Sequence, residues 1–372
     1  MKKILHIFSV LGFRPLEGQI DFIRKNYDGN NHHFICLNQS LQSIHDRFSV
    51  PDITKGIHLD FVRIKFYNFL QAYKFLEKCN GYDLIIFHSI FIPFSLTFLL
   101  SFKNEILKKS VWIVWGGDLY AYREKNKSLT NYMMEVLRKR IIPSFYCIVS
   151  NNCDFQLCRK WYHSAAINFQ AYYPYLGVQN ELSYENKDTK DAIHILLGNS
   201  ATKSNRHIDA LMYLKKFNEE NIKIFIPLSY GDQEYGKYVE TFAKEIFGDK
   251  AIALNDYIDR ESYGQILSEI DIGIFNHNRQ QAMGTIYSLI LSGAKIYANA
   301  DSCIFEILIK ENDLKVYSID EIENNSFKEF YEFDSSIASE NRHKTQVFLS
   351  NQNLKFQWDK VFSLPSNNNQ LS

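Results

Sequence analysis

The sequence predicts an α/β protein made of two doubly wound domains. Its 372 residues exceed the size at which a single hydrophobic core usually keeps growing. Short apolar runs alternate with helical patterns along most of the chain, and one polar stretch, 172–191, interrupts this alternation. Apolar residues at 46% and charged residues at 23% place the chain among ordinary globular proteins.

The expected strands are short, continuous apolar runs, each followed by a helical segment. Such runs are typical of parallel strands that helices cover on both faces. Ligands of doubly wound domains bind beyond the carboxyl ends of the strands, so functional residues are expected in the loops that follow them. The expected strands lie at 3–10, 83–90, 111–116, 145–150, 192–198, 222–229, 271–276 and 294–299.

The polar stretch sets the domain boundaries, because its composition is typical of a linker. We expect a first domain over 1–175, a linker over 176–191 and a second domain over 192–350. A C-terminal helix and a polar tail are expected over 351–372.

The zero net charge hides an asymmetry between the two halves of the chain. Residues 1–180 contain 22 Lys and Arg against 13 Asp and Glu, a charge of +9, and the remaining residues carry −9. A basic first half favours contact with an anionic partner, either nucleic acid, a membrane surface or a phosphorylated acceptor. The alternative is that these charges only solvate the two domains differently.

Two apolar segments bear on localisation. The start MKKILHIFSV resembles a signal peptide, but its apolar run ends at Gly12 without a small-residue cleavage site, so we expect a first strand there. The segment 90–102 contains Pro93 and is too short to span a bilayer, and three lysines follow it closely. The six cysteines lack paired zinc-ligand spacing, and because no secretory signal is recognised we expect a reducing compartment. We therefore expect a cytoplasmic protein that contacts a membrane peripherally.

The stretch HILLGNSATKSNRHIDAL, 194–211, looks at first like a phosphate loop of an ATPase. A Walker A motif requires G-x-x-x-x-G-K-[ST], but Gly198 precedes Lys203 by one residue too few and the second glycine is missing. The remaining pattern is a strand that ends at Gly198, a polar loop and a helix start. Loop amides and a helix N-terminus can hold an anion, with Lys203 or Arg206 supplying charge.

A second strand-end loop lies in DIGIFNHNRQQAMGTIYSLILSGAKIYAN, 271–299. It carries Arg279, Gln280 and Gln281 and leads into Gly284 and Thr285 at the start of an apolar helix. Two such loops in one domain suit a nucleoside diphosphate that lies across the ends of the strands. A nicotinamide enzyme is disfavoured because no G-x-G-x-x-G follows any expected strand.

Four segments carry a resemblance to a known family: LLGNSATKSNRHIDAL, IPLSYG, DIGIFNHNRQQAMGTI and VWGGDLY. They resemble the bacterial TDP-N-acetylfucosamine:lipid II N-acetylfucosaminyltransferases, over roughly 110–300. The resemblance implies a GT-B fold, with two Rossmann-like domains that face a central cleft. It also implies a nucleotide-sugar donor held mainly by the second domain, a polyprenyl-diphosphate-linked acceptor and no required metal or other cofactor. The resemblance is vague over the first hundred residues, which belong to the domain expected to bind the acceptor. The identity of the acceptor is therefore the feature that the resemblance predicts least well.

Donor binding is expected at the two strand-end loops and at nearby tyrosines that border the base. Without a metal, backbone amides, a helix N-terminus and basic side chains must carry the charge of the leaving diphosphate. The glutamines are expected to bond hydroxyl or acetamido groups of the sugar. The expected donor-binding residues are Gly198, Asn199, Ser200, Lys203, Arg206, Tyr230, Tyr257, Arg279, Gln280, Gln281, Gly284 and Thr285.

The base that deprotonates the acceptor hydroxyl is expected in the first domain. Asp118 follows a buried strand and two glycines, so its carboxylate would sit at a strand end with room for a ligand. The alternative is that Asp118 caps a helix. Glu17, expected in the loop after the first strand, and His88, at the end of DLIIFH, are rival bases. The expected acceptor-binding residues are Arg14, Gly116 and Gly117.

The sequence thus predicts a transferase that moves a 4-acetamido-4,6-dideoxyhexose from dTDP to a lipid-linked saccharide in bacterial surface glycan synthesis. It would act at the inner face of the inner membrane and bind no nucleic acid. One alternative is a GT-B transferase that uses a UDP- or GDP-sugar such as GDP-fucose. The other is a scaffold of glycan assembly that binds a nucleotide-sugar without turnover.

Overall fold

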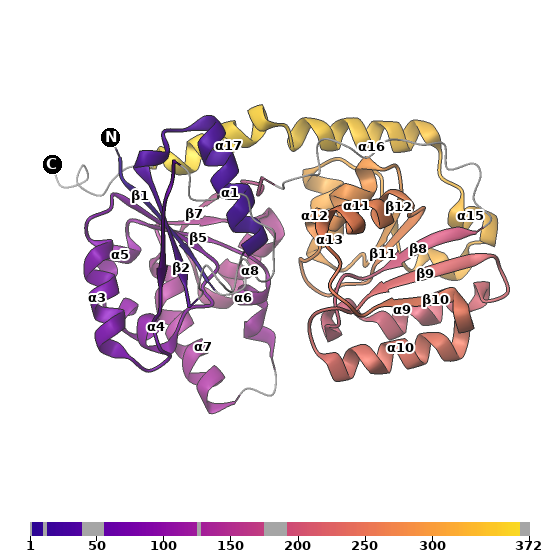
Figure 1. Cartoon of the computed structure of the whole chain (residues 1–372), viewed down its shortest axis with the longest axis horizontal. Helices are drawn as coiled ribbons and strands as arrows, with labels where there is room; N and C mark the ends of the chain where they lie inside the picture. The colour runs from indigo at the N-terminus through magenta and orange to yellow at the C-terminus, as the bar shows by residue number, and fades with distance from the viewer. Residues whose placement is uncertain (1, 10–12, 39–55, 125–127, 175–191, 365–372) are drawn as a thin grey trace. The chain divides into compact units, whose positions relative to one another are not determined.

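The computed structural model describes residues 2–9, 13–38, 56–124, 128–174 and 192–364. The chain divides into two compact units, each with its own parallel sheet (Figure 1). Unit 1 comprises Met1–Leu176 together with Asn351–Ser372, and unit 2 comprises Gly177–Ser350.

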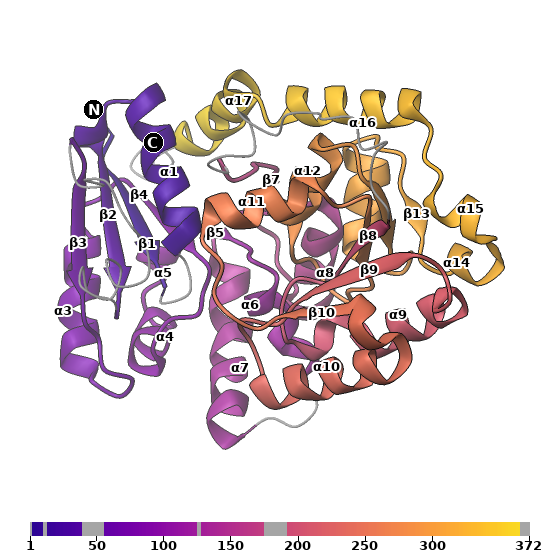
Figure 2. The same cartoon turned by 45° about the vertical axis from the view of Figure 1, so that its right-hand side comes forward.

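Unit 1 is built on a seven-stranded sheet in the order β3-β2-β1-β4-β5-β6-β7. All its paired strands are parallel, and β3 lies at one edge (Figure 2). Nearly every strand residue of β1, β2, β4, β5 and β6 is buried, as the continuous apolar runs predict. The strands are β1 Ile4–Phe8, β2 His32–Leu37, β3 His58–Val62, β4 Leu84–His88, β5 Ser110–Ile113, β6 Cys147–Val149 and β7 Ile167–Phe169.

The C-terminal helix α17, Asn351–Phe362, completes unit 1. Its Leu354, Trp358 and Val361 join one hydrophobic cluster with residues of α1 and with the strands β1, β2, β4, β5 and β6. A helix from the far end of the chain therefore covers the sheet beside α1 (Figure 1). The other helices of the unit are α1 Phe13–Asn26, α3 Phe69–Cys79, α4 Phe94–Leu100, α5 Asn104–Leu107, α6 Gly117–Tyr120, α7 Leu129–Ile141 and α8 Asn152–Tyr162.

Unit 2 is built on a six-stranded parallel sheet in the order β10-β9-β8-β11-β12-β13. Its strands are β8 Ile193–Leu197, β9 Ile222–Pro227, β10 Ala251–Leu254, β11 Ile272–Phe275, β12 Lys295–Ala298 and β13 Tyr317–Ser318. Its helices are α9 His207–Leu214, α10 Gln233–Phe247, α11 Arg260–Ser268, α12 Met283–Leu291, α13 Cys303–Glu306, α14 Glu321–Asn324, α15 Phe327–Tyr331 and α16 Ser335–Phe348. Helix α16, in yellow, packs against α12 (Figure 1).

The predicted fold class is confirmed, because both units are parallel α/β sheets of the Rossmann-like kind. The expected linker at 176–191 lies outside the described residues. One local expectation is wrong: Glu17 lies within α1, which begins at Phe13, and not in a loop. Pro15 permits this earlier start, because proline is tolerated in the first turn of a helix. Among the described helices, none is long and apolar enough to cross a membrane.

Candidate functional site

The carboxyl edge of the unit 2 sheet brings the expected donor-binding residues together. Gly198 follows β8, Tyr230 follows β9 and Tyr257 follows β10. The loop 276–282 follows β11, the strand beside β8 on its other side. Because parallel strands end at the same edge, segments from four strands meet where doubly wound domains bind their ligands.

The first loop turns sharply at Gly198. This residue has φ +70°, and a Cβ added to it would lie 2.7 Å from His207 Nε2 and 2.8 Å from Asn205 Oδ1. Only glycine fits such a position without strain. The Asn205 side chain closes the loop, since its Oδ1 accepts from the Asn199 amide at 2.9 Å and its Nδ2 donates to Thr202 Oγ1 at 2.7 Å. The same Nδ2 also donates to the buried Ser200 hydroxyl at 3.2 Å.

Side-chain hydrogen bonds join the first loop to the second. Ser204 Oγ donates to Gln281 Oε1 at 2.8 Å, and Gln281 Nε2 donates to Asn199 Oδ1 at 2.9 Å. Arg279 Nε donates to Ser204 Oγ at 3.3 Å. We call residues 198–206 and 276–282 with these bonds the loop clamp. It holds the two loops in one fixed arrangement.

His277 is a buried residue of the loop clamp that joins its two loops. Its side chain is fully buried and its Nε2 lies 2.7 Å from Asn205 Oδ1. An amide oxygen only accepts, so Nε2 carries the proton. Burial, with smaller effects from His207 and Arg279, lowers the pKa of His277 well below its usual value. A neutral imidazole therefore links the loops at neutral pH.

Basic and aromatic side chains lie on and beside the loop clamp. Lys203 is exposed in a 3₁₀ turn, and Arg279 is half-buried. The Tyr230 ring is 56% exposed and its hydroxyl accepts from Asn199 Nδ2 at 2.6 Å, while Tyr257 is 58% exposed. Gln280 is half-buried in the same loop.

Helix α12 begins beside the second loop. Ala282 takes a left-handed conformation with φ +62° and is the residue before the helix. Gly284 and Thr285 lie in the first turn, where backbone N–H groups lack partners within the helix. Arg206 differs from expectation, because its Nε donates to Asp209 Oδ2 at 2.7 Å on the surface. That ion pair satisfies part of the Arg206 guanidinium, whereas Lys203 is exposed and Arg279 is half-buried in the second loop.

In unit 1, Asp118 is fully buried beneath the end of β5. Its Oδ2 accepts from the Trp112 indole at 2.9 Å and from the Ile90 amide at 3.1 Å. Its Oδ1 accepts from the amides of Trp115 and Leu119, both at 3.1 Å. Four donors thus converge on a carboxylate that ties the loops after β4 and β5 together. This arrangement favours a positioning role over contact with the acceptor.

The loop held by Asp118 contains the two expected glycines. Gly116 has φ +78° and precedes α6, and Gly117 is the first residue of that helix. The left-handed backbone at Gly116 needs glycine, because a Cβ is strained there. The structure explains this stretch as a tight turn at the carboxyl edge of the sheet.

His88 belongs to a chain of three buried histidines. His6 Nδ1 lies 3.0 Å from His88 Nε2, and His6 Nε2 lies 3.0 Å from His32 Nδ1. His88 Nδ1 also bonds the Tyr173 hydroxyl, which accepts from the Trp115 indole at 3.0 Å. Burial lowers the pKa of His6 and His88 well below the usual value and that of His32 to about 4. These imidazoles are neutral in the folded protein.

Glu17 is the half-buried member of the three base candidates, since Asp118 and His88 are fully buried. It lies in the second turn of α1, the helix that follows β1, and so stands near the carboxyl edge of the sheet. Arg14 lies in the first turn of the same helix, and its side chain is outside the described residues.

A pocket that the sequence did not indicate lies at the same edge of unit 1. It has a volume of about 250 Å³, and its lining includes Phe66, Phe91 and Asn131. Arg138 and Glu135 also line it and form an ion pair at 3.5 Å, with both side chains less than a tenth exposed. Glu135 Oε1 accepts from the Tyr162 hydroxyl at 2.8 Å. Because these residues are far apart in sequence, only the fold shows that they line one pocket.

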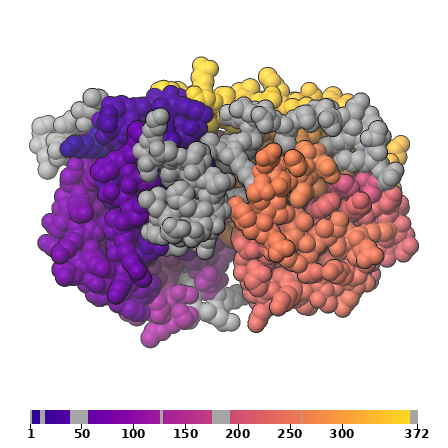
Figure 3. Space-filling model, in the orientation of Figure 1, coloured from indigo at the N-terminus to yellow at the C-terminus, as the bar shows by residue number. Residues whose placement is uncertain are grey.

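Around this pocket the surface is rich in exposed apolar side chains. Of the twenty exposed large hydrophobic residues in the described part of the chain, eleven lie between 66 and 136, on or beside α3, α4 and α7. The three helices pack side by side, α3 on α4 and α4 on α7, and their residues reach the surface in violet and purple (Figure 3). We call this surface the α3–α4–α7 face. Its exposed apolar residues are Phe66, Tyr67, Phe69, Leu70, Tyr73, Phe98, Phe102, Leu129, Tyr132, Met133 and Val136.

Comparison with known proteins places the chain among sugar-transferring enzymes. Residues 67–366 match the model of the family described as 4-alpha-L-fucosyltransferase, glycosyl transferase group 56. HepE of Anabaena in complex with UDP-glucose is 13% identical and superposes with a TM-score of 0.70, covering 98% of this chain and 100% of HepE. Sucrose-phosphate synthase of Thermosynechococcus elongatus is 13% identical with a TM-score of 0.66, over 97% and 98% of the two chains. These likenesses confirm the GT-B fold.

Proposed function

Because this chain belongs to the 4-α-L-fucosyltransferase family of glycosyltransferases, we propose that it transfers a 4-acetamido-4,6-dideoxyhexose from a dTDP-sugar. The proposed acceptor is a polyprenyl-diphosphate-linked saccharide of a bacterial surface glycan, either common antigen or O-antigen. A 6-deoxyhexose donor agrees with the fucosyl transfer in the family's description. Nucleotide-sugars are also the ligands named for HepE.

The loop clamp is the observation that carries this proposal. A diphosphate needs positive charge and N–H donors, and the clamp offers Lys203, Arg279 and the first turn of α12 on one edge. The exposed rings of Tyr230 and Tyr257 can border a base, and Gln280 and Gln281 can bond the sugar. Because the loops are fixed by their own hydrogen bonds, little ordering is needed when the donor binds.

The proposed reaction is a direct displacement with inversion. The acceptor hydroxyl oxygen forms a bond to the anomeric carbon, and the bond from that carbon to the diphosphate oxygen breaks. The nucleoside diphosphate leaves with the electron pair, and Lys203, Arg279 and the α12 amides stabilise its charge. A base accepts the hydroxyl proton. We assign this base to Glu17, since its side chain is half-buried whereas those of Asp118 and His88 are fully buried.

The α3–α4–α7 face supports a lipid-linked acceptor. Its aromatic residues are interspersed with cations: Arg140 lies 4.6 Å from the Phe102 ring centroid and Lys103 lies 5.8 Å from that of Tyr73. Aromatic and aliphatic side chains mixed with Lys and Arg are typical of surfaces that dock on anionic membranes. The proposed orientation is this face on the inner leaflet of the inner membrane.

The pocket on this face suits a saccharide better than a phosphate. Two carboxylates, Glu124 and Glu135, line the pocket together with one arginine, Arg138. Because the negative side chains outnumber the positive one, the pocket disfavours binding of a phosphate group. Carboxylate, amide and guanidinium groups beside the rings of Phe66 and Phe91 can bond sugar hydroxyls and pack against a sugar ring. We therefore propose that this pocket receives acceptor sugar.

A thermal-shift series with dTDP, UDP, GDP, CDP and ADP tests the donor assignment. The expected result is stabilisation by dTDP above the other four. A preference for GDP or UDP would contradict the dTDP assignment and favour a fucosyltransferase that uses GDP-fucose or a UDP-sugar. Transfer is expected to persist in EDTA, because basic side chains and amides carry the diphosphate charge. Donor binding without any transfer would favour the scaffold.

A further inference from the structure

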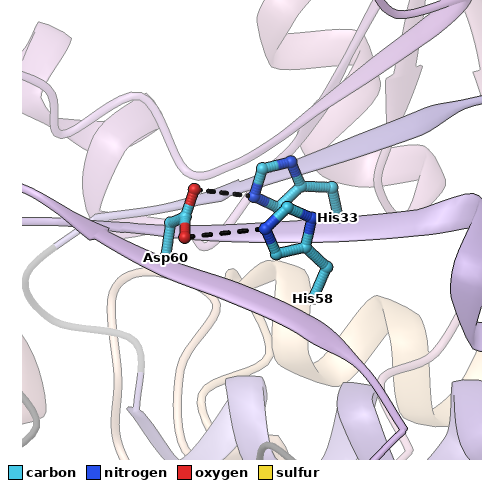
Figure 4. Close-up of side chains that lie close together, drawn as sticks. All are labelled: His33, His58 and Asp60. Carbon is cyan, nitrogen blue, oxygen red and sulfur yellow. Dashed lines mark hydrogen bonds and ion pairs between the residues drawn. The ribbon is translucent and has the colours of Figure 1, made fainter.

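Three side chains that can bind metal lie together on the strands β2 and β3. His33 and His58 are paired across the two strands, and Asp60 follows His58 two residues along the same strand face. The two imidazole rings stack at 3.8 Å and 3° (Figure 4). Both present Nε2 to the Asp60 carboxylate, at 3.1 Å from His33 and 3.7 Å from His58. One nitrogen from each ring and one oxygen thus converge.

We propose that His33, His58 and Asp60 bind a divalent transition-metal ion, with Zn²⁺ as the preferred ion. Their ligand atoms all lie within 4.8 Å of one another. Two imidazoles and one carboxylate are a donor set that Zn²⁺ accepts, with water in the remaining position. Zinc bonds of about 2.0–2.2 Å require the ligand atoms to approach further. His58 and Asp60, with side chains 65% and 48% exposed, are free to make that adjustment.

The surroundings of His33 prepare it as a ligand. Its Nδ1 hydrogen-bonds the Tyr82 hydroxyl, and this bond fixes the ring orientation with Nε2 toward Asp60. Burial, and then the neighbouring His58, lowers the pKa of His33.

The position of the group indicates a structural site. His33 and His58 lie near the amino ends of their strands, whereas the acceptor pocket and the base candidates lie at the carboxyl edge. Strand β3 is at the edge of the sheet and pairs with β2 (Figure 2). An ion held by one ligand from β2 and two from β3 would cross-link this edge strand to the sheet and stabilise unit 1.

Calorimetric titration of the chelator-treated full chain with ZnCl₂ tests the proposal. We expect one site per chain, and a dissociation constant at least tenfold higher in His58→Ala and in Asp60→Asn. The matched control His343→Ala removes an exposed histidine of unit 2 and leaves the constant unchanged. Co²⁺ provides a second readout, because bound cobalt gives visible absorption that reports nitrogen and oxygen ligands.

Both variants change exposed side chains, and circular dichroism checks that they fold. Zinc should raise the unfolding temperature of the parent and of His343→Ala but not that of the two site variants. Equal affinity in all four proteins, or no binding by the parent, would overturn the proposal. Because the group is outside the transfer machinery, His58→Ala should retain sugar transfer. This result separates a failure of the metal site from a failure of the proposed function.

Discussion

The carboxyl edges of the two sheets are built in opposite ways. In unit 2 polar side chains bond one another near the surface, so that Ser204, Gln281 and Asn199 join two loops that also carry Lys203 and Arg279. In unit 1 the polar groups Asp118 and His88 are buried, and the α3–α4–α7 face exposes apolar side chains. The first edge suits a small charged ligand, and the second suits an amphiphilic one.

Among the variants that test this comparison, Glu17→Gln is expected to have the largest effect, which is on turnover. Loss of a general base typically lowers turnover by about 10²–10⁴-fold. The dissociation constant of the nucleotide should stay within twofold, because the donor groups are in unit 2. Asp21→Asn, on the same helix and paired with Lys25, is the matched control and should retain turnover. Normal turnover in Glu17→Gln would remove Glu17 from the base role.

Asp118→Asn should act through stability. In the asparagine variant, an NH₂ group replaces one carboxylate oxygen. The buried N–H groups that donate to that oxygen in the parent then face another donor and lose their hydrogen-bond partner. Such a loss costs about 3 kcal/mol in the free energy of unfolding. Urea denaturation measures it. A variant as stable as the parent but without turnover would instead make Asp118 the base.

A smaller effect is expected from Leu70→Ser on the α3–α4–α7 face. Leu70 is 64% exposed in the described structure, and its burial in a membrane interface contributes about 1.5 kcal/mol, or roughly tenfold in partition. Sedimentation with vesicles that contain anionic lipid measures this partition. Tyr238→Ser removes a comparably exposed apolar residue of unit 2 and should change nothing. Equal loss in both variants would contradict a specific membrane face.

The smallest effect concerns pH. The folded-state pKa values of His6, His32 and His88 lie below the unfolded value of about 6.5, so the unfolded chain binds more protons as pH falls. The contribution of these neutral histidines to the free energy of unfolding is fully present above about pH 6.5. It is lost as the pH falls from about 6.5 to 4. His6→Gln keeps a donor and an acceptor but does not titrate. Its free energy of unfolding should fall about 1 kcal/mol less than the parent's between pH 7 and 5.5. An unchanged pH dependence would contradict this assignment.

The contrast between apolar and polar segments explains which strands the sequence could predict. Strands with continuous apolar runs, such as β4 and β8, were predictable because both faces are buried. Strand β3, HLDFV, lacks such a run because Asp60 interrupts it, and in β2, HHFICL, two histidines shorten the run to four residues. The positions of Gly198 and of residues 276–282 followed directly from the strands that precede them.

Contacts between distant segments were beyond the sequence. Asp118 could be placed at a strand end, but the convergence of the Trp112 indole and three amides on it depends on the folded loops. His6 and His88 meet because β1 and β4 are neighbours in the sheet. Asn205 and His277, the centre of the loop clamp, are 72 residues apart. A polar residue in a strand-end loop is the only sequence signal that either one gives.

The central claim is that the loop clamp of unit 2 holds the donor diphosphate. The most direct measurement is the dissociation constant of dTDP for Lys203→Ala and Arg279→Ala, with the exposed Lys237→Ala of α10 as the control. Each clamp variant should bind about tenfold more weakly, since one charge-assisted hydrogen bond is worth about 1.5 kcal/mol, and Lys237→Ala should bind like the parent. Unchanged dissociation constants in both clamp variants would contradict the claim.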